Sequence, residues 1–368
     1  MKKYLFVLFL ILPSLLLGQE SISIGNKYSI YSSILKEKRS YWVYLPPEYD
    51  NNAYGKASYP VIFLLDGDTN FTTLVAIQQA FTKGMYNNMP QCIIVGIPNT
   101  DRTRDLTPSK AYLKHNGKEM FTNSGGSELF TSFLLHELKS KIDSTYRTNG
   151  YNILIGHSFG GLFTINTLLH HADAFNAYIA LDPSLWWDSR KVYKEAESVW
   201  ESRNFSNKSL YVAMAKNQDK PNDEQKHSAT IRDFCTIVLP SAPNNKLNAA
   251  WKYYENEDHG TVIVPAIFDA LRNLFQGIEL PVKKIPETPD LIPEYYKKLS
   301  VRLGHSFVPD EVLVDNIGKY ALSIGNIEGA IKIFEYNYMP FAHSKNARES
   351  LVNAYLANDN KEKAALIK

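Results

Sequence analysis

The feature that most constrains the fold of this chain is a series of short segments that are apolar at every position. They lie at residues 61–65, 93–97, 153–155, 177–181 and 210–214. A strand with apolar side chains on both faces has to be covered on both sides, as in the parallel sheets of α/β proteins. Helical patterns lie between these segments, at residues 128–142, 161–170 and 262–275. The alternation predicts an α/β fold with a doubly wound, mostly parallel sheet, whose ligands bind at the carboxyl ends of the strands.

One apolar segment, 153–155, leads directly into Gly-His-Ser-Phe-Gly at 156–160, and Gly161 then opens a helix. This strand–turn–helix context is typical of the nucleophile elbow of serine hydrolases. Gly156 and Gly160 remove side chains that would collide with the neighbouring helix and strand, and the helix dipole favours negative charge close to Ser158. We therefore predict Ser158 as a nucleophile. The alternative is a glycine-rich structural turn whose serine only caps the helix.

A nucleophilic serine needs a general base, which follows it in chain order in this type of site. His259 lies between the acidic loop 255–258 and an amphipathic helix that begins near Val262. We predict His259 as the base. His227, in a polar loop, remains an alternative, whereas His157 flanks the nucleophile and is expected to project away from the active face.

The acid that would orient the histidine is less constrained by the sequence. It usually lies in a loop after a strand that follows the nucleophile. Asp219 is the first choice because it is nearest to the end of the 210–214 segment, and Asp223 and Asp182 are further candidates. A Ser–His pair without an acid is also compatible with the sequence.

A serine hydrolase also needs two N–H groups that stabilise the oxyanion of the tetrahedral intermediate. The residue after the nucleophile, Phe159, provides one such backbone N–H. The second is expected from the loop after residues 61–65, where Gly67 allows close approach of the backbone and Asp68 supplies the N–H group.

The two ends of the chain differ in character from its centre. Lys2 and Lys3 precede a short apolar run, which predicts a signal peptide over residues 1–19 and an exported protein, periplasmic or secreted. Near the other end, prolines at 281–295 predict a linker, and residues 296–368 contain positions that recur after 34 residues, such as Ile317 and Leu351. This period is similar to that of tetratricopeptide repeats and predicts a small all-α module. It is interpreted as a stabilising cap, with a protein-binding role as the alternative.

Composition excludes several classes of function. A net charge of +2 argues against a nucleic-acid-binding protein, which would carry a concentrated basic face. The two cysteines, Cys92 and Cys235, are too few for a disulfide framework. No Cys/His spacing indicates a metal site, and we expect neither a metal nor a cofactor.

A set of motifs in this chain occurs in matching order in the putative esterase family of α/β-hydrolases. They are Leu-Asp-Gly at 65–67, Gly-His-Ser-Phe-Gly-Gly at 156–161, Pro-Ser-Leu-Trp-Trp at 183–187 and Asp-His-Gly at 258–260. The family includes enterobactin-type siderophore esterases, feruloyl and acetylxylan esterases, S-formylglutathione hydrolase and mycolyltransferases, and this chain looks most like the siderophore-esterase branch. The resemblance implies an α/β-hydrolase domain over residues 20–280, with Asp68 as an oxyanion donor. Several members have Glu where this chain has residues 216–219, so the resemblance leaves the acid open.

Three further residues are expected to face a substrate. Arg102 could bind an anionic group or instead hold loops together through Arg–Asp pairs. Trp186 and Trp187 could line the pocket and stack on an acyl or sugar group, with one of the two in the core. The leading hypothesis is hydrolysis of a small-molecule carboxylic ester, of a siderophore or an acylated glycan, through an acyl-enzyme on Ser158. Acyl transfer by the same residues, or an inactive hydrolase domain serving as a scaffold, are the alternatives.

Overall fold

The computed structural model describes residues 22–111, 113–115, 118–216 and 226–367. The predicted signal peptide and two of the candidate acids, Asp219 and Asp223, lie outside these ranges. Within them, no helix has both the length and the apolar character that a membrane span requires.

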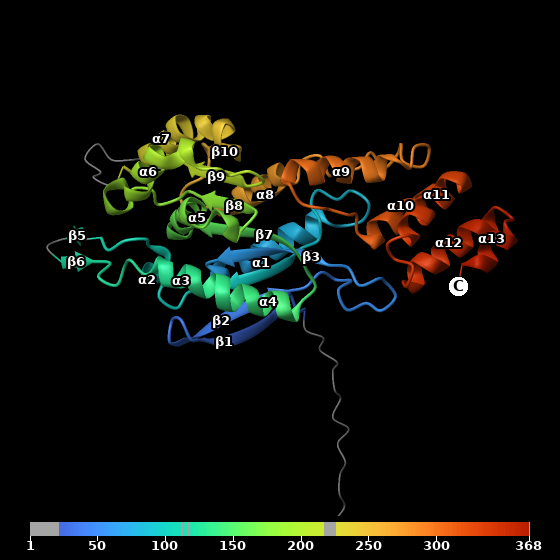
Figure 1. Cartoon of the computed structure of the whole chain (residues 1–368), viewed down its shortest axis with the longest axis horizontal. Helices are drawn as coiled ribbons and strands as arrows, with labels where there is room; N and C mark the ends of the chain where they lie inside the picture. The colour runs from blue at the N-terminus through green and yellow to red at the C-terminus, as the bar shows by residue number, and fades with distance from the viewer. Residues whose placement is uncertain (1–21, 112, 116–117, 217–225, 368) are drawn as a thin grey trace, which may run out of the picture.

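A mixed sheet of eight strands forms the centre of the molecule (Figure 1). In spatial order the strands are β1 (Asn26–Ser32), β2 (Glu37–Tyr44), β4 (Ile93–Ile97), β3 (Tyr59–Leu65), β7 (Thr148–His157), β8 (Ala177–Leu181), β9 (Ser209–Ala215) and β10 (Asn248–Tyr254). The pairs β1–β2 and β2–β4 are antiparallel, and all other neighbours in this sheet are parallel. Each predicted apolar segment lies in one of the strands β3, β4, β7, β8 and β9, which confirms the mostly parallel α/β sheet.

Strand β3 shows why these segments lack polar residues. Ile62 and Leu64 pack into one hydrophobic core, whereas Val61, Phe63 and Leu65 pack into a second core on the other face. Successive side chains of a strand point to opposite faces, so a strand between two cores is apolar at every position.

Helices cover both faces of this sheet. Over the first core lie α1 (Gly67–Phe81) and α8 (Ile263–Leu274). Over the second lie α3 (Ser127–Phe133), α4 (Ser140–Thr145), α5 (Phe159–His170), α6 (Trp187–Val199) and α7 (His227–Asp233). The wider π-type turns Leu134–Lys139 and Phe234–Val238 extend α3 and α7. The smaller elements are α2 (Arg102–Leu106) and the hairpin β5 (Leu113–His115) and β6 (Lys118–Met120).

The C-terminal region is helical throughout its regular elements. It contains α9 (Leu291–Leu303), α10 (Glu311–Ser323), α11 (Ile327–Tyr338), α12 (Lys345–Ala357) and α13 (Lys361–Leu366). Helix α9 begins inside the predicted linker 281–295. Pro293 lies in the first turn of α9, where the N–H that proline lacks would have no partner within the helix in any case. The linker is therefore shorter than its prolines suggested.

Helices α10 and α11 repeat as α12 and α13 after 34 residues, the period expected from the sequence. The repeat extends to the caps. Asn326 accepts a hydrogen bond from the N–H of Gly329, and Asn360 accepts the equivalent bond from Lys363. The second helix of each pair therefore begins with the same type of side-chain cap. Membership of the tetratricopeptide class stays a prediction.

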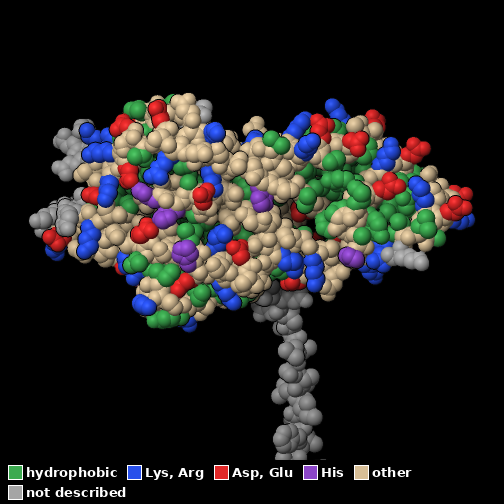
Figure 2. Space-filling model, viewed as in Figure 1, with side chains coloured by type: hydrophobic (Ala, Val, Ile, Leu, Met, Phe, Trp, Pro, Cys, Tyr) green, Lys and Arg blue, Asp and Glu red, His purple; other side chains and the backbone are tan. Residues whose placement is uncertain are grey.

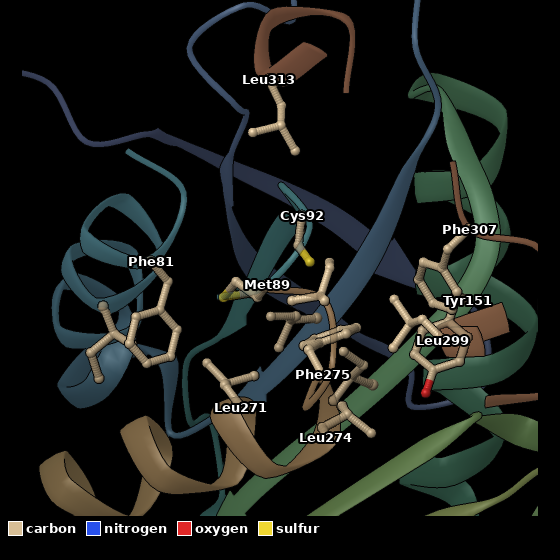
Figure 3. Close-up of a cluster of buried hydrophobic side chains, with 14 of the residues drawn as sticks. Phe81, Met89, Cys92, Tyr151, Leu271, Leu274, Phe275, Leu299, Phe307 and Leu313 are labelled. Atoms are coloured by element: carbon tan, nitrogen blue, oxygen red, sulfur yellow. The ribbon is translucent and has the colours of Figure 1, made fainter. Parts of the chain in front are cut away.

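These C-terminal helices and the segments that connect them (residues 291–367), called here the tail, pack against the central sheet at the amino ends of its middle strands. Figure 3 shows Leu299 and Phe307 of the tail beside Tyr151 of β7 and Phe275, and all four belong to the core on the α1/α8 face. The contact surface between the tail and the sheet, called here the seam, also contains hydrogen bonds. In one of them the Gly55 N–H donates to Glu311 Oε2 at 2.6 Å. Because Gly55 precedes β3 and the predicted site follows its carboxyl end, the tail lies at the edge of the sheet away from that site.

The tail does not bury all of its apolar surface in this seam. Figure 2 shows hydrophobic side chains gathered on the viewed face of the tail, and Ile324, Met339 and Leu366 are among its exposed hydrophobic residues.

Cys92 and Cys235 are both buried and unpaired, and burial raises the pKa of each thiol. Buried thiols in such surroundings are unreactive.

Candidate active site

Ser158 lies on a sharp turn between β7 and α5, with φ 59° and ψ −115°. This conformation is strained for a residue with a side chain. It is held by the Ser158 N–H to Leu181 O at 3.0 Å and by Ser158 O, which accepts from the Leu162 and Ser184 N–H groups. A Cβ atom at Gly156 would lie 2.2 Å from Gly160 O. The turn therefore has the geometry of the predicted elbow, for the steric reason inferred from its glycines.

The hydroxyl of Ser158 lies within hydrogen-bond distance of the hydroxyl of a second serine. Its Oγ lies 3.2 Å from the Oγ of Ser184, which is buried after β8. Among the described residues, Ser158 Oγ has no hydrogen bond to a histidine in this conformation. A rotation about χ1 would redirect the hydroxyl, as is common in sites without substrate.

His259 is held by Asp182, at the carboxyl end of β8. The Nδ1 of His259 lies 2.6 Å from Asp182 Oδ2, and Asp182 Oδ1 accepts the Ala215 N–H at 2.8 Å. The Asp182 side chain is completely buried, whereas that of His259 is 42% exposed. With Nδ1 occupied in this way, Nε2 of His259 is the nitrogen left to exchange protons with a reacting group.

Asp182 was the third candidate for the acid, behind Asp219 and Asp223, both of which lie outside the described residues. The sequence did contain a signal for Asp182. It directly follows Leu181, at the carboxyl end of the strand next to the one that carries Ser158. Which of several loop carboxylates reaches His259 depends on how the loops fold back over the sheet, which no local pattern encodes.

A second histidine contacts the same carboxylate. Nε2 of His227 lies 2.9 Å from Asp182 Oδ2. Burial on its own would raise the pKa of Asp182, but hydrogen bonds to His227 and His259 lower it well below its ordinary value. The carboxylate therefore stays ionised across the physiological pH range.

His157 does not project away from the active face, contrary to expectation. Its Nε2 donates to the carbonyl oxygen of His259 at 2.7 Å, and the two ring centroids are 4.5 Å apart. Burial, followed by the proximity of His259, lowers the pKa of His157 to about 4, so its ring is neutral at pH 7. The sequence placed His157 on the correct strand but did not show that the His259 loop covers that side of it.

The two predicted oxyanion donors lie at the starts of helices. Phe159 is the first residue of α5 and Asp68 the second of α1, and their N–H groups have no acceptor within the part of the chain that the structure describes. Free N–H groups in a first helical turn are suited to bind negative charge. A Cβ atom at Gly67 would lie 2.5 Å from Ile97 N, which explains the glycine before Asp68.

Arg102 forms hydrogen bonds to the chain segments that precede these two helices. Its Nε and Nη2 donate to the carboxylate of Asp66 at 2.6 and 3.1 Å, and Nη2 also donates to His157 O at 3.0 Å. Asn99 adds a further bond to Asp66 at 2.7 Å. Of the two roles considered for Arg102, this geometry corresponds to holding loops through an Arg–Asp pair.

The two tryptophans have different environments. Trp187 is completely buried, and its Nε1 donates to Ser109 O at 3.1 Å. This places Trp187 in the core, so its predicted contact with a substrate is not possible in this conformation. Trp186 is only partly buried and packs against Phe159, with ring centroids 6.1 Å apart. Trp186 alone of the pair therefore has surface available beside the elbow.

One group of side chains in the described ranges has the composition of a metal site: Asp182, His227 and His259. Its two inner contacts, 2.6 and 2.9 Å, are hydrogen-bond lengths. Ligands around a tetrahedral zinc, at about 2.0–2.1 Å from the metal, would lie farther apart than this. The three side chains thus form a hydrogen-bonded network as they stand.

Comparison with known proteins agrees with this site. Residues 32–259 match the family described as "Putative esterase". Ferri-bacillibactin esterase BesA of Bacillus subtilis is 27% identical over 269 residues, 67% of this chain and 89% of that protein. The siderophore enterobactin esterase of Emericella nidulans is 26% identical over 250 residues, 59% of this chain and 82% of that protein.

A solved structure extends the likeness. The crystal structure of an IroE-like serine hydrolase from Shewanella oneidensis is similar with a TM-score of 0.77 at 30% identity, and the match covers 85% of this chain and 98% of that one. The family match spans well over half of the sequence. The chain therefore belongs to the putative esterase family of α/β-hydrolases, and it is a carboxylic ester hydrolase.

Proposed function

We propose that this protein is an exported esterase that cleaves a siderophore-type ester through a triad of Ser158, His259 and Asp182. The observation that carries the triad is the 2.6 Å contact between His259 Nδ1 and Asp182 Oδ2, in a chain whose Ser158 has the elbow backbone. Asp182 replaces Asp219 as the acid in this proposal.

The chemistry follows from the positions of these groups. The Ser158 hydroxyl first rotates away from Ser184. Ser158 Oγ then attacks the ester carbonyl while His259 Nε2 accepts the proton of this hydroxyl. Asp182 keeps the proton of His259 on Nδ1 and stabilises the imidazolium that forms. The Phe159 and Asp68 N–H groups stabilise the oxyanion. His259 then protonates the leaving alcohol, and water releases the acyl group by the same steps in reverse order.

The substrate class is inferred from relatives together with the site. BesA and the Emericella enzyme are named for bacillibactin and enterobactin, respectively. Trp186, partly exposed beside Phe159, provides an aromatic surface for the acyl group of such an ester. A siderophore ester is therefore our first choice and an acylated glycan the second.

Export and the role of the tail complete the proposal. Export rests on the signal-peptide pattern of residues 1–19. The tail acts as a stabilising cap, because its core residues Leu299 and Phe307 continue the core of the sheet at the edge away from Ser158.

Labelling with a fluorophosphonate probe tests the nucleophile and the substrate class together. We expect the protein to be labelled and Ser158→Ala not to be. A cyclic catecholate ester should then compete for labelling at lower concentration than feruloyl or acetyl-sugar esters. Labelling that persists in Ser158→Ala would refute the nucleophile, and stronger competition by a glycan ester would refute the substrate class.

A further inference from the structure

The carboxylate of Asp182 is shared by two imidazole rings from different elements. His259, in the loop between β10 and α8, and His227, at the start of α7, both contact Oδ2, at 2.6 and 2.9 Å. The two rings are nearly perpendicular, at 86°, with centroids 5.2 Å apart. A triad requires only one of these contacts, so the second needs an explanation.

The orientation of His227 indicates that its ring is directed at Asp182. Its other nitrogen, Nδ1, is buried and has no hydrogen-bond partner among the residues that the structure describes. The polar contact of this ring is therefore the one between Nε2 and Asp182 Oδ2. Because a carboxylate only accepts hydrogen bonds, the proton of a neutral His227 lies on Nε2.

We propose that His227 is a positioning residue of the catalytic triad: its Nε2–H holds the Asp182 carboxylate in the orientation that His259 requires and weakens the pull of that carboxylate on the His259 proton. This inference rests on the proposed triad. The Ala215 N–H fixes Oδ1 and His227 fixes Oδ2, so the carboxylate cannot rotate away when His259 moves during the reaction. A hydrogen bond to Oδ2 also makes the carboxylate a weaker acceptor for the Nδ1–H of His259.

Within the described ranges, the other charged groups near the two rings have different partners. His157 is neutral and donates to the backbone of His259. Asp258 is exposed and accepts from the N–H groups of Gly260 and Thr261. On α7 itself, Asp233 is paired with Arg190 of α6 at 2.6 Å.

Three variants test the proposal with p-nitrophenyl acetate. His227→Ala removes the donor, His227→Gln places an uncharged N–H donor near the position of Nε2, and His343→Ala changes an exposed histidine of the tail. We expect kcat of His227→Ala to fall about tenfold with KM little changed, because a hydrogen bond to a charged group is lost. The acid limb of its kcat/KM profile should move to higher pH, because the freed carboxylate favours protonated His259. His227→Gln should recover most of kcat, and His343→Ala should equal the wild type.

Two outcomes would overturn the inference. Wild-type kcat and pH profile in His227→Ala would show that the ring has no role in the triad. A His227→Gln variant as slow as His227→Ala, with both folded by circular dichroism, would show that an uncharged N–H donor is not what matters.

A spectroscopic measurement separates this inference from the proposed function. In Ser158→Ala, which has no nucleophile, the His259 Nδ1–H proton should give a strongly downfield NMR resonance. Adding His227→Ala should shift that resonance further downfield, because Asp182 then accepts more strongly from His259. An unchanged resonance would contradict the role of His227 even if the protein proved to hydrolyse a different ester. Failure of Ser158 to react with the fluorophosphonate probe would instead contradict the proposed function.

Discussion

Asp182 Oδ2 and His259 Nδ1 lie 2.6 Å apart, although the residues are separated by 77 positions in the chain. Asp182 has φ 41°, a left-handed conformation at the carboxyl end of β8, so a turn immediately after the strand directs its side chain into the site. Asp182→Asn should therefore lower kcat by about 10³-fold or more, since the amide cannot stabilise the same tautomer and charge of the histidine. Asp182→Asn and Asp219→Asn are a matched pair of variants, and their kcat values should be compared by steady-state kinetics. A larger loss of kcat in Asp219→Asn would show that Asp219 is the acid.

The buried, neutral His157 makes stability depend on pH. Its pKa in the folded state is about 4, against 6.5 as the ordinary value, so between these values the unfolded chain binds a proton that the folded chain does not. Stability is therefore lost as the pH falls through this window. From pH 7 to pH 5 the contribution of this group should decrease by about 2 kcal/mol. Urea unfolding at both pH values should show a smaller decrease for His157→Gln than for the wild type; an equal decrease would contradict the assignment.

The elbow leaves no space for a side chain at Gly156. A Cβ atom there would meet Gly160 O at 2.2 Å, whereas one at Gly84 would meet nothing within 4 Å. Gly156→Ala should destabilise the protein by more than about 4 kcal/mol or prevent folding. Gly84→Ala should cost only about 1 kcal/mol, from its positive φ. Thermal unfolding of both variants provides the comparison, and similar melting temperatures would count against the backbone clash.

Substitution of Trp187 should mainly lower stability, whereas substitution of Trp186 should mainly weaken substrate binding. Trp187→Ala removes a completely buried ring and should cost about 3–5 kcal/mol of stability. Trp186→Ala should cost less and should mainly raise KM for esters with a bulky aromatic acyl group, leaving KM for an acetyl ester nearly unchanged. A uniform effect of Trp186→Ala on both esters would argue that its ring does not contact the acyl group.

The seam of the tail should affect stability without affecting catalysis. Glu311 is buried there and accepts hydrogen bonds from the Gly55 N–H at 2.6 Å and from Ser344 Oγ at 2.5 Å. Glu311→Ala leaves the Gly55 N–H without its acceptor and removes one of the two acceptors of Ser344 Oγ, and it should cost about 2–3 kcal/mol. Below the melting transition, kcat/KM should remain at the wild-type value, because the seam lies at the opposite edge of the sheet from Ser158. A folded Glu311→Ala protein with impaired turnover would show coupling between the two edges.

Local sequence patterns predicted the buried strands of the central sheet and the sharp turn at Ser158. Residues 153–161 combine a strand that must be buried on both faces with glycines that only a tight turn requires, so the elbow around Ser158 could be inferred without a structure. The 34-residue period of the sequence is likewise the offset between α10 and α12 and between α11 and α13. The start of α9 could not be inferred in the same way, because a proline in the first helical turn looks like one in a linker.

The sequence by itself determined the alternation of buried strands and helices, the strained serine turn and the repeat, because each depends on interactions between residues that are near in the chain. Only the tertiary structure decided which acid reaches His259, that His157 lies beneath its loop, and that His227 shares Asp182. These contacts join the ends of β7 and β8 to the start of α7 and to the loop after β10. Their partners are brought together only when the sheet assembles, and the closeness of two side chains across such loops depends on backbone paths that no local pattern records.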